Sequence, residues 1–147
     1  MAASVSDVIP VETAQHLPGL FRERVRRSPQ ATAYRHYLEA DQTWHDLSWQ
    51  EMADRITFWQ TALQAEGLKP GDRVGVMLRN CPQWVMFDQA ALGLGLVIVP
   101  LYTNDRAENL GYILEDANVQ LIFIENEEHW SCLSEVYHHL SHIKTVV

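Results

Sequence analysis

The fold class is decided by the stretch Gly71-Asp72-Arg73-Val74-Gly75-Val76-Met77-Leu78-Arg79-Asn80-Cys81-Pro82 and by the segment Gly93-Leu94-Gly95-Leu96-Val97-Ile98-Val99-Pro100-Leu101-Tyr102. The first has the pattern of a turn, a buried strand and a helix start near Pro82. In the second, glycines end a helix and a run that is apolar on both faces follows, as expected of a central parallel strand. Strands that alternate with helices in this way predict a parallel α/β sheet.

The same alternation continues to the end of the sequence. We expect strands at 73–78, 96–101, 119–124 and 143–147, with helices between them, the last at 127–140. Asn80 is the expected N-cap of the helix that begins at Pro82, and Asn104 or Asp105 that of the next helix. Right-handed crossovers place the helices on the faces of the sheet. The final strand, 143–147, is expected to be an unpaired edge that favours aggregation.

The first seventy residues have a different organisation. Residues 1–16 are predicted to be a loose lead-in, and a short amphipathic helix begins at Leu17. Strand-like segments at 31–38 and 43–47 predict a β-hairpin. Ser48 and Glu51 then form the pattern of a capping box at the start of a long helix, which Gly67 ends. The inward side chains expected on that helix are Met52, Ile56, Trp59 and Leu63.

Composition describes one soluble globular domain and excludes several classes of protein. The 147 residues are 47% hydrophobic and carry a net charge of −8, which argues against nucleic-acid binding. The one basic cluster (Arg22, Arg24, Arg26 and Arg27, beside Glu23) is expected to be a solvated helix face. Cys81 and Cys132 do not suggest a disulfide framework, and no signal peptide or membrane span is visible. A cytoplasmic protein is the simplest expectation, with peripheral membrane contact left open.

Several patterns that could carry chemistry are incomplete. Gly93-Leu94-Gly95 begins like a dinucleotide fingerprint, but it precedes a strand, whereas the fingerprint follows one. We expect these glycines to let the helix end and the chain pack closely against the sheet. Cys81 could act as a nucleophile at a helix N-terminus, yet no His partner is identifiable, which favours a structural use. The acidic residues have local roles as turn, cap or helix-face residues.

A group of histidines near the C-terminal end is the only metal-like pattern. It consists of His129, Cys132, His138, His139 and His142, with Glu135 and His138 in a Glu-x-x-His arrangement. Structural zinc sites need four ligands at characteristic spacings, and di-iron bundles need two Glu-x-x-His motifs. An exposed helix with solvated histidines is therefore the preferred interpretation. From the residues alone, no catalytic, cofactor-binding or metal-binding residue is assigned.

Five segments in order resemble the adenylate-forming (AMP-binding) enzymes, and two of them, Asn80 to Trp84 and Tyr112 to Ala117, are most similar to the long-chain fatty acid–CoA ligase branch of that family. The five segments are Leu47-Ser48-Trp49-Gln50-Glu51-Met52, Gly67 to Val74, Asn80-Cys81-Pro82-Gln83-Trp84, Ala91 to Leu101, and Tyr112-Ile113-Leu114-Glu115-Asp116-Ala117. Each motif alone is weakly specific, whereas their order and spacing are fairly specific. The resemblance runs from about Leu17 to Val147. It implies that residues 17–147 are the first part of a large N-terminal AMP-binding domain.

The resemblance also implies an activity. Such enzymes activate a fatty acid with ATP and Mg²⁺ to an acyl-adenylate and then transfer the acyl group to CoA. The family's Ser/Thr/Gly-rich phosphate loop, its nucleotide-binding motifs and its catalytic lysine have no counterpart in this sequence. We therefore expect an N-terminal portion of a ligase that is inactive by itself and binds none of these cofactors.

Two other hypotheses stay open. The chain could be a non-catalytic interaction module, with self-association through apolar surfaces; Trp84, Phe87 and the 96–101 strand are the candidates for such a surface if nothing covers them. Alternatively, it could belong to a different adenylate-forming enzyme, such as a medium-chain or aryl acid ligase or a carrier-protein adenylation domain. The acid substrate cannot be read from these residues.

Overall fold

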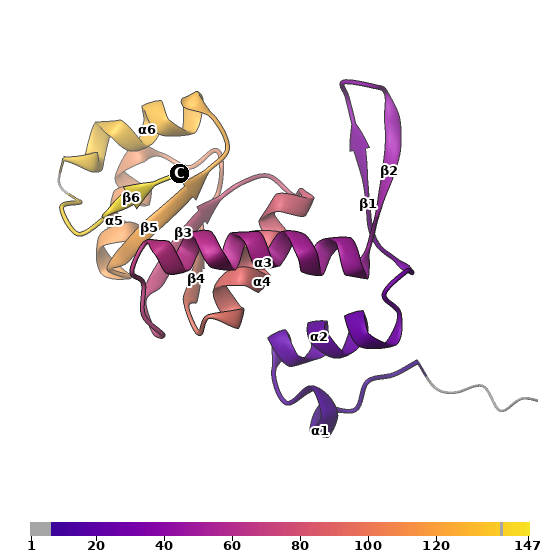
Figure 1. Cartoon of the computed structure of the whole chain (residues 1–147). Helices are drawn as coiled ribbons and strands as arrows, with labels where there is room; N and C mark the ends of the chain where they lie inside the picture. The colour runs from indigo at the N-terminus through magenta and orange to yellow at the C-terminus, as the bar shows by residue number, and fades with distance from the viewer. Residues whose placement is uncertain (1–6, 139) are drawn as a thin grey trace, which may run out of the picture. The chain divides into compact units, whose positions relative to one another are not determined.

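The computed structural model describes residues 7–138 and 140–147. Backbone contacts divide the chain into two units, Met1–Asp54 and Arg55–Val147, and each is described by itself. Figure 1 shows their elements in order. The architecture is α/β, with an antiparallel hairpin in the first unit and a parallel sheet flanked by helices in the second, as the sequence predicts. Among the described residues, no helix combines the length and the apolar character that crossing a membrane requires.

The first unit is built around the predicted hairpin. Strands β1 (Thr32–Leu38) and β2 (Thr43–Ser48) pair antiparallel, so that His36 lies opposite His45. Helix α2 spans Leu17–Arg27. A further helical turn, α1 (Val11–Ala14), lies inside the segment that was expected to be a loose lead-in.

Aromatic contacts tie the parts of this unit together. The ring of Trp49, the first residue of α3, lies with its centroid 5.7 Å from that of Phe21 and 6.0 Å from that of Tyr34. The edge-to-face geometry of the first pair is favourable for aromatic rings. Leu47 on β2 is also buried. These contacts join α2 and the hairpin to the start of α3.

Helix α3 (Trp49–Ala65) starts with the predicted capping box. The backbone N–H of Glu51 donates to Ser48 Oγ over 3.2 Å, and Glu51 Oε2 accepts from the backbone N–H of Ser48 over 2.8 Å. These two bonds satisfy amides that have no partner inside the helix. Of the expected inward side chains, Met52, Ile56 and Leu63 are buried and Trp59 is half-buried. Gly67 follows the helix with φ +71°, as its predicted stop role requires.

The second unit contains a four-stranded parallel sheet in the order β4-β3-β5-β6. Its strands are β3 (Arg73–Met77), β4 (Val97–Pro100), β5 (Val119–Ile124) and β6 (Thr145–Val146). The connecting helices are α4 (Pro82–Gly93), α5 (Ala107–Asp116) and α6 (Glu127–Tyr137). The elements match those predicted, although α6 ends at Tyr137 rather than 140, and β6 is shorter than 143–147. This order is that of the first four strands of a flavodoxin-like doubly wound sheet.

The prediction that 96–101 is a central strand was wrong for the described residues. Strand β4 lies at one edge of the sheet, and Val97 is 47% exposed. The backbone N–H groups of Val97 and Leu101 donate to Asp72 and Val76 carbonyls, each over 2.9 Å. Alternate residues of a parallel strand face opposite neighbours, so Pro100 is directed to the free edge, where its missing N–H costs no ladder bond. The expected edge position of the last strand is confirmed, since among the described strands β6 pairs only with β5.

Two predicted helix caps were also wrong. Cys81, not Asn80, is the N-cap of α4, with φ −151° and ψ 165°. The residue before a proline is kept out of the helical region, so Pro82 at the first helical position makes Cys81 the cap. Arg106, not Asn104 or Asp105, is the N-cap of α5. Asp105 Oδ1 still accepts hydrogen bonds from the backbone N–H of Arg106 and from Asn109 Nδ2, each over 2.8 Å.

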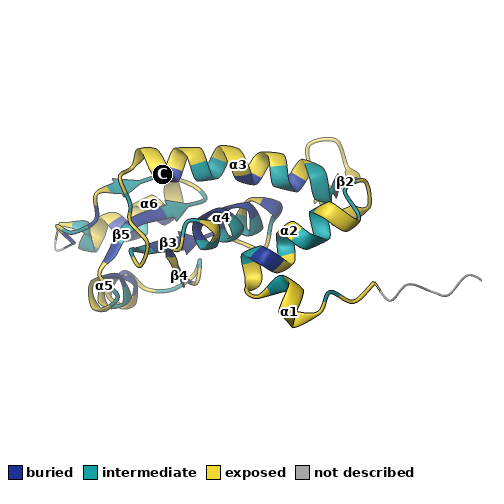
Figure 2. Cartoon of the chain, turned by 60° about the horizontal axis from the view of Figure 1, so that its bottom comes forward, coloured by how far each residue is buried: buried dark blue, intermediate teal, exposed yellow. Residues whose placement is uncertain are grey.

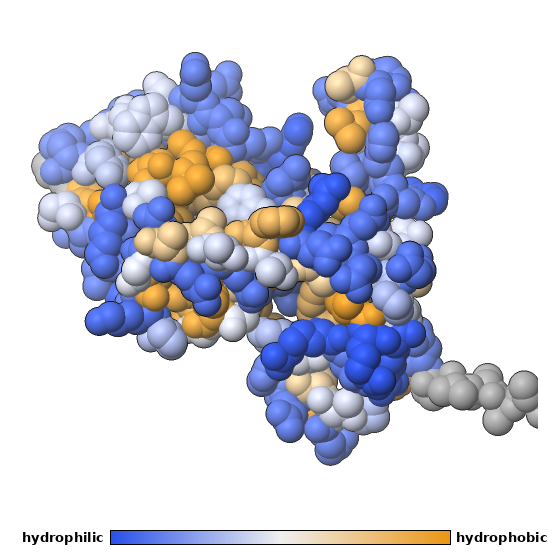
Figure 3. All heavy atoms as spheres, viewed as in Figure 1, coloured by the Kyte–Doolittle hydropathy of each residue, from blue (hydrophilic) through white to orange (hydrophobic). Residues whose placement is uncertain are grey.

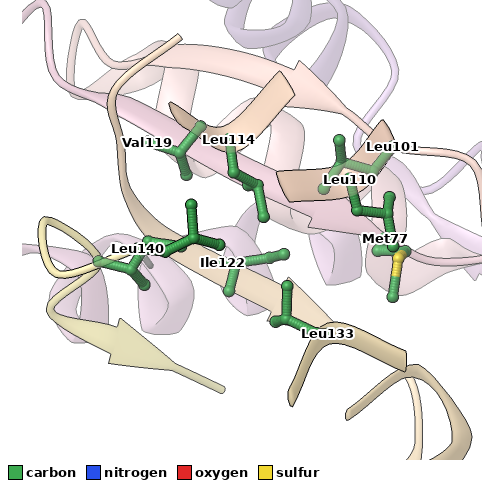
Figure 4. Packing of buried hydrophobic residues seen from close by; sticks show 9 residues of the cluster. Met77, Leu101, Leu110, Leu114, Val119, Ile122, Leu133 and Leu140 are labelled. Atoms are coloured by element: carbon green, nitrogen blue, oxygen red, sulfur yellow. The ribbon is translucent and has the colours of Figure 1, made fainter. Parts of the chain in front are cut away.

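The core of the second unit lies on both sides of the central strands. Figure 2 shows buried residues along β3 and β5 and on the inner side of α4. On one side, Leu110 and Leu114 of α5 and Leu133 of α6 pack with Met77 and Ile122 of the sheet (Figure 4). A second cluster joins α3, α4 and β5 through the rings of Trp59, Phe87 and Phe123, whose centroids are 4.8–5.9 Å apart.

Candidate functional site

The carboxyl edge of the sheet, where β3 and β5 lie side by side, is the position that this topology offers for a ligand. The chain leaves β3 through α4 to β4 on one side, whereas β5 lies on the other side of β3. Connections diverge at such a switch point, and open α/β sheets bind ligands outside the carboxyl ends of their strands there. The residues that follow β3 and β5 are therefore the first candidates for a site.

The loops at this edge are joined by Arg79 and Glu125. Arg79 Nε lies 2.8 Å from Glu125 Oε1, and the backbone N–H of Arg79 donates to Glu125 Oε2 over 3.2 Å. The Arg79 side chain is 73% exposed and that of Glu125 is 24% exposed. The carboxylate thus holds the loop after β3 to the end of β5. Sequence reasoning did not single out this pair because its members are 46 residues apart.

Helix α6 begins beside this pair. Asn126 is its N-cap, and Asn126 Oδ1 accepts a hydrogen bond from the backbone N–H of His129 over 2.9 Å. The imidazole of His129 is buried, and its Nδ1 accepts from the backbone N–H of Glu125 over 3.4 Å. His129 therefore supports the turn between β5 and α6. It is not the solvated histidine that the sequence suggested.

The histidines and the cysteine of the metal-like pattern face different neighbours. Cys132 Sγ lies 3.7 Å from the Asp105 carbonyl oxygen, and His142 Nε2 lies 3.1 Å from that of Leu114. Burial, and then the nearby carboxylates of Glu135, Glu108 and Asp105, raise the pKa of the Cys132 thiol, which works against a thiolate ligand. His138 is the C-cap of α6, and His139 lies outside the described residues. Within 7–138 and 140–147, no group of three or more His, Cys, Asp or Glu residues could hold a metal ion.

The glycines before β4 serve packing, as the sequence indicated. Gly95 has φ +74°, and a Cβ there would lie 3.2 Å from Pro70 Cβ. A Cβ on Gly93 would lie only 2.2 Å from Gln60 Nε2. The segment ends α4 and enters β4, the reverse of the strand-to-helix order of a phosphate-binding loop. These residues do not fit a nucleotide site, and we assign them no contact with ATP.

Three of the four arginines of α2 have acidic partners. Arg26 and Arg27 both bond Glu23, with Nε to carboxylate oxygen distances of 2.8 and 2.7 Å. These hydrogen bonds, first from Arg26 and then from Arg27, lower the pKa of Glu23 to about 2. Arg24 pairs with Asp7, and its side chain is only 20% exposed. The cluster is a helix face with its own acidic partners, although Arg24 is less solvated than expected.

The apolar residues suggested as an adhesive surface are mostly interior. Phe87, Leu96 and Leu101 are buried, and Trp84 is half-buried, while Val97 on β4 remains exposed. The large exposed apolar side chains lie elsewhere, including Leu17 on α2, Trp44 on β2 and Tyr112 on α5. Of the residues suggested as the surface of an interaction module, those on the edge strand β4 are therefore the ones that remain exposed.

Known proteins resemble this chain along most of its length. The family model for AMP-binding enzymes matches residues 21–147. Long-chain-fatty-acid–CoA ligase FadD15 of Mycobacterium bovis is 27% identical over 134 residues, which cover 90% of this chain and 22% of that protein. Long-chain-fatty-acid–CoA ligase 1 of Homo sapiens is 32% identical over 97 residues, 65% of this chain and 14% of that protein. The chain thus spans about a fifth or less of the length of these relatives.

Solved structures show the same fold. A fatty acyl CoA synthetase of Mycobacterium tuberculosis superposes with a TM-score of 0.76 at 20% identity, over 88% of this chain and 26% of that one. The anthranilate CoA ligase AuaEII superposes with a TM-score of 0.78 at 16% identity, over 88% of this chain and 24% of that one. The match of the family model over residues 21–147 shows that the chain belongs to the AMP-binding enzyme family.

Proposed function

We propose that this chain is the N-terminal part of a long-chain fatty acid–CoA ligase. The complete enzyme would form an acyl-adenylate from a fatty acid and ATP with Mg²⁺, and would then transfer the acyl group to CoA. The observation that carries the proposal is the similarity to long-chain ligases over 90% of the chain. Its location would be cytoplasmic.

In this proposal the 147 residues supply architecture, and the reacting groups lie outside them. Met52, Phe87 and Ile122 occupy the interior, and Arg79 and Glu125 bond each other across two loops. The Ser/Thr/Gly-rich phosphate loop that the resemblance implies has no counterpart in the sequence. We therefore assign no catalytic, cofactor-binding or metal-binding residue to the chain, and we expect it to be inactive alone.

A second candidate is an enzyme that activates an aryl acid. It is favoured by one observation, the fold similarity to the anthranilate CoA ligase AuaEII with a TM-score of 0.78. At 16% identity this likeness concerns the fold, so it supports the chemistry less than the sequence similarity to the long-chain ligases does.

The test begins with the gene. Reading the frame past the codon for Val147 establishes whether a Ser/Thr/Gly-rich phosphate loop follows. If it does, the complete protein is assayed for AMP release and CoA thioester formation with hexadecanoate, octanoate, benzoate and anthranilate. The proposal predicts the highest kcat/KM with hexadecanoate. A preference for octanoate or for either aromatic acid would overturn it, and an immediate stop codon would favour the interaction module.

A further inference from the structure

Two histidines face each other across the middle of the hairpin. His36 on β1 lies directly opposite His45 on β2, and their ring centroids are 5.9 Å apart with an interplanar angle of 39°. Both residues are half-buried. Side chains that are directly opposite in an antiparallel pair share one face of the ribbon and interact. These two residues are referred to below as the histidine pair.

Asp41, in the loop between the strands, fixes the protonation of one ring nitrogen of His45. Asp41 Oδ1 accepts from the Thr43 hydroxyl over 2.8 Å, and Asp41 Oδ2 lies 2.7 Å from His45 Nε2. These hydrogen bonds, first that from Thr43 and then that from His45, lower the pKa of Asp41, so its carboxyl stays ionised in weak acid. Because an ionised carboxylate only accepts hydrogen bonds, His45 Nε2 carries a proton. A further proton must therefore bind at His45 Nδ1.

His36 lacks a comparable arrangement. Its Nδ1 atom is buried and has no hydrogen-bond partner among the described residues. Neutral imidazole has one ring nitrogen without a proton, whereas imidazolium donates from both nitrogens. A charged His36 would therefore bury an N–H group that has no acceptor, which is costly. It would also face a second cation on His45, and like charges directly opposite each other in a sheet are destabilising.

The other groups around the ribbon leave this imbalance in place. Arg35 bonds Asp46 on the opposite face, over 2.8 Å between Nη2 and Oδ2. On the face of the histidine pair, Tyr34 packs against Trp49 at the start of α3, with centroids 6.0 Å apart, and neither ring is charged in weak acid. Glu51 belongs to the capping box of α3. Asp41 is thus the ionised group that is bonded to the histidine pair.

The hairpin is sensitive to an electrostatic change of modest size. Strands β1 and β2 form a two-stranded sheet of their own. Figure 3 shows the ribbon as largely hydrophilic, with apolar atoms near its closed end. The loop at that end adds one further carboxylate on the exposed residue Glu39. Two strands that bury little apolar surface are only marginally stable, so local opening requires little free energy.

We propose that the histidine pair makes the closed half of the hairpin a pH-responsive element, which is ordered near neutral pH and opened by acid. Free histidine becomes charged as the pH falls through about 6.5. The opened strands can accept these protons without a buried N–H group and without two facing cations. Stability rises with pH wherever the opened state binds more protons, so the closed form loses stability as the pH falls. Asp41 opposes the opening, because its charge offsets that of a protonated His45.

Hydrogen exchange of the β1 and β2 amides in the 147-residue protein tests this inference. It is measured at about pH 7.5 and about pH 5.5, where free histidine is mostly charged and ordinary carboxyls remain ionised, and is corrected for the intrinsic effect of pH on exchange. We expect acid to raise the opening constant of the hairpin by about tenfold. His36→Gln should abolish the rise, His45→Gln should reduce it, and Asp41→Asn should enlarge it. His142→Gln, in the second unit, is the matched control that should leave the rise unchanged.

Three results would overturn the inference. They are equal opening constants at the two pH values, a rise that persists in His36→Gln, and a hairpin that is better protected in acid. The last result would show that the bond between Asp41 and His45 outweighs the repulsion within the histidine pair. Should one variant disturb the hairpin at neutral pH, the wild type and the other histidine variant still decide the outcome. The measurement contains no ATP, CoA or turnover, so its outcome is independent of the proposed ligase activity.

Discussion

Glu125 bonds both the guanidinium and the backbone of Arg79, and so fastens the loop after β3 to the end of β5. The two strands are already neighbours in the sheet. The carboxylate extends that pairing past the last ladder bond, at the edge where a doubly wound sheet places its ligands. In this chain the pair is the clearest polar link between the two loops.

The strength of this link can be measured with a double-mutant cycle. Arg79→Met removes the guanidinium, whereas Glu125→Gln keeps an acceptor for the backbone N–H of Arg79. Because Arg79 is largely exposed, we expect a coupling energy of about 0.2–1 kcal/mol in urea unfolding at low salt. High salt should weaken the coupling. A coupling of zero at low salt would show that the pair is incidental.

The two glycines before β4 should respond differently to alanine. Gly95→Ala forces a side chain into positive φ and toward Pro70, and we expect it to lower the free energy of unfolding by about 1–3 kcal/mol. Gly93→Ala meets only the end of the Gln60 side chain, which can rotate away, so its expected effect is smaller. Thermal unfolding followed by circular dichroism compares them, and equal losses would refute the distinction.

Pro100 is expected to protect the edge of the sheet. Pro100→Val adds an N–H that faces the free side of β4, and it should increase self-association in concentration-dependent light scattering. Pro100→Lys adds the same N–H together with a charge, which makes it the matched control that should stay as monomeric as the wild type. Identical masses for all three proteins would contradict the role assigned to Pro100.

The pKa of Glu23 predicts a pH dependence. This pKa is lowered from 4.5 to about 2 by Arg26 and Arg27, so the stability that their bonds contribute is complete above pH 4.5. It is lost progressively as the pH falls from 4.5 toward 2. Carboxyl NMR titration should give Glu23 the low value, and Arg26→Gln with Arg27→Gln should raise it toward 4.5. Arg22→Gln on the same helix should leave it unchanged; a wild-type value near 4.5 would contradict the pairing.

Local patterns predicted most of the secondary structure, because hairpin, capping box and strand–helix alternation depend on residues close in sequence. Strand order does not depend on such local patterns. For this reason the apolar run 96–101 was predicted to be a central strand, although β4 lies at an edge of the sheet. The cap of α4 was predicted at Asn80 because asparagine side chains are favourable caps. The conformational restriction that Pro82 imposes on Cys81 decides the position instead. The link between Arg79 and Glu125 escaped notice because only the pairing of β3 with β5 brings these residues together.

The expectation that the histidines share a helix face was wrong for a related reason. Helical spacing places His138 and His142 on one face only if the helix continues, but α6 ends at Tyr137. His142 then contacts the Leu114 carbonyl, and His129 supports the turn at the other end of α6. Spacing therefore predicts a shared face only within the bounds of an element, and those bounds depend on tertiary packing.

The most direct test of the account is an assay of the 147-residue protein for acyl-CoA formation with hexadecanoate, ATP, Mg²⁺ and CoA. A chain that supplies architecture and no reacting groups should give no product above the protein-free reaction, while circular dichroism shows that it is folded. ATP-dependent acyl-CoA formation by the purified chain, lost when CoA is omitted, would contradict the account and would require a catalytic site among these residues.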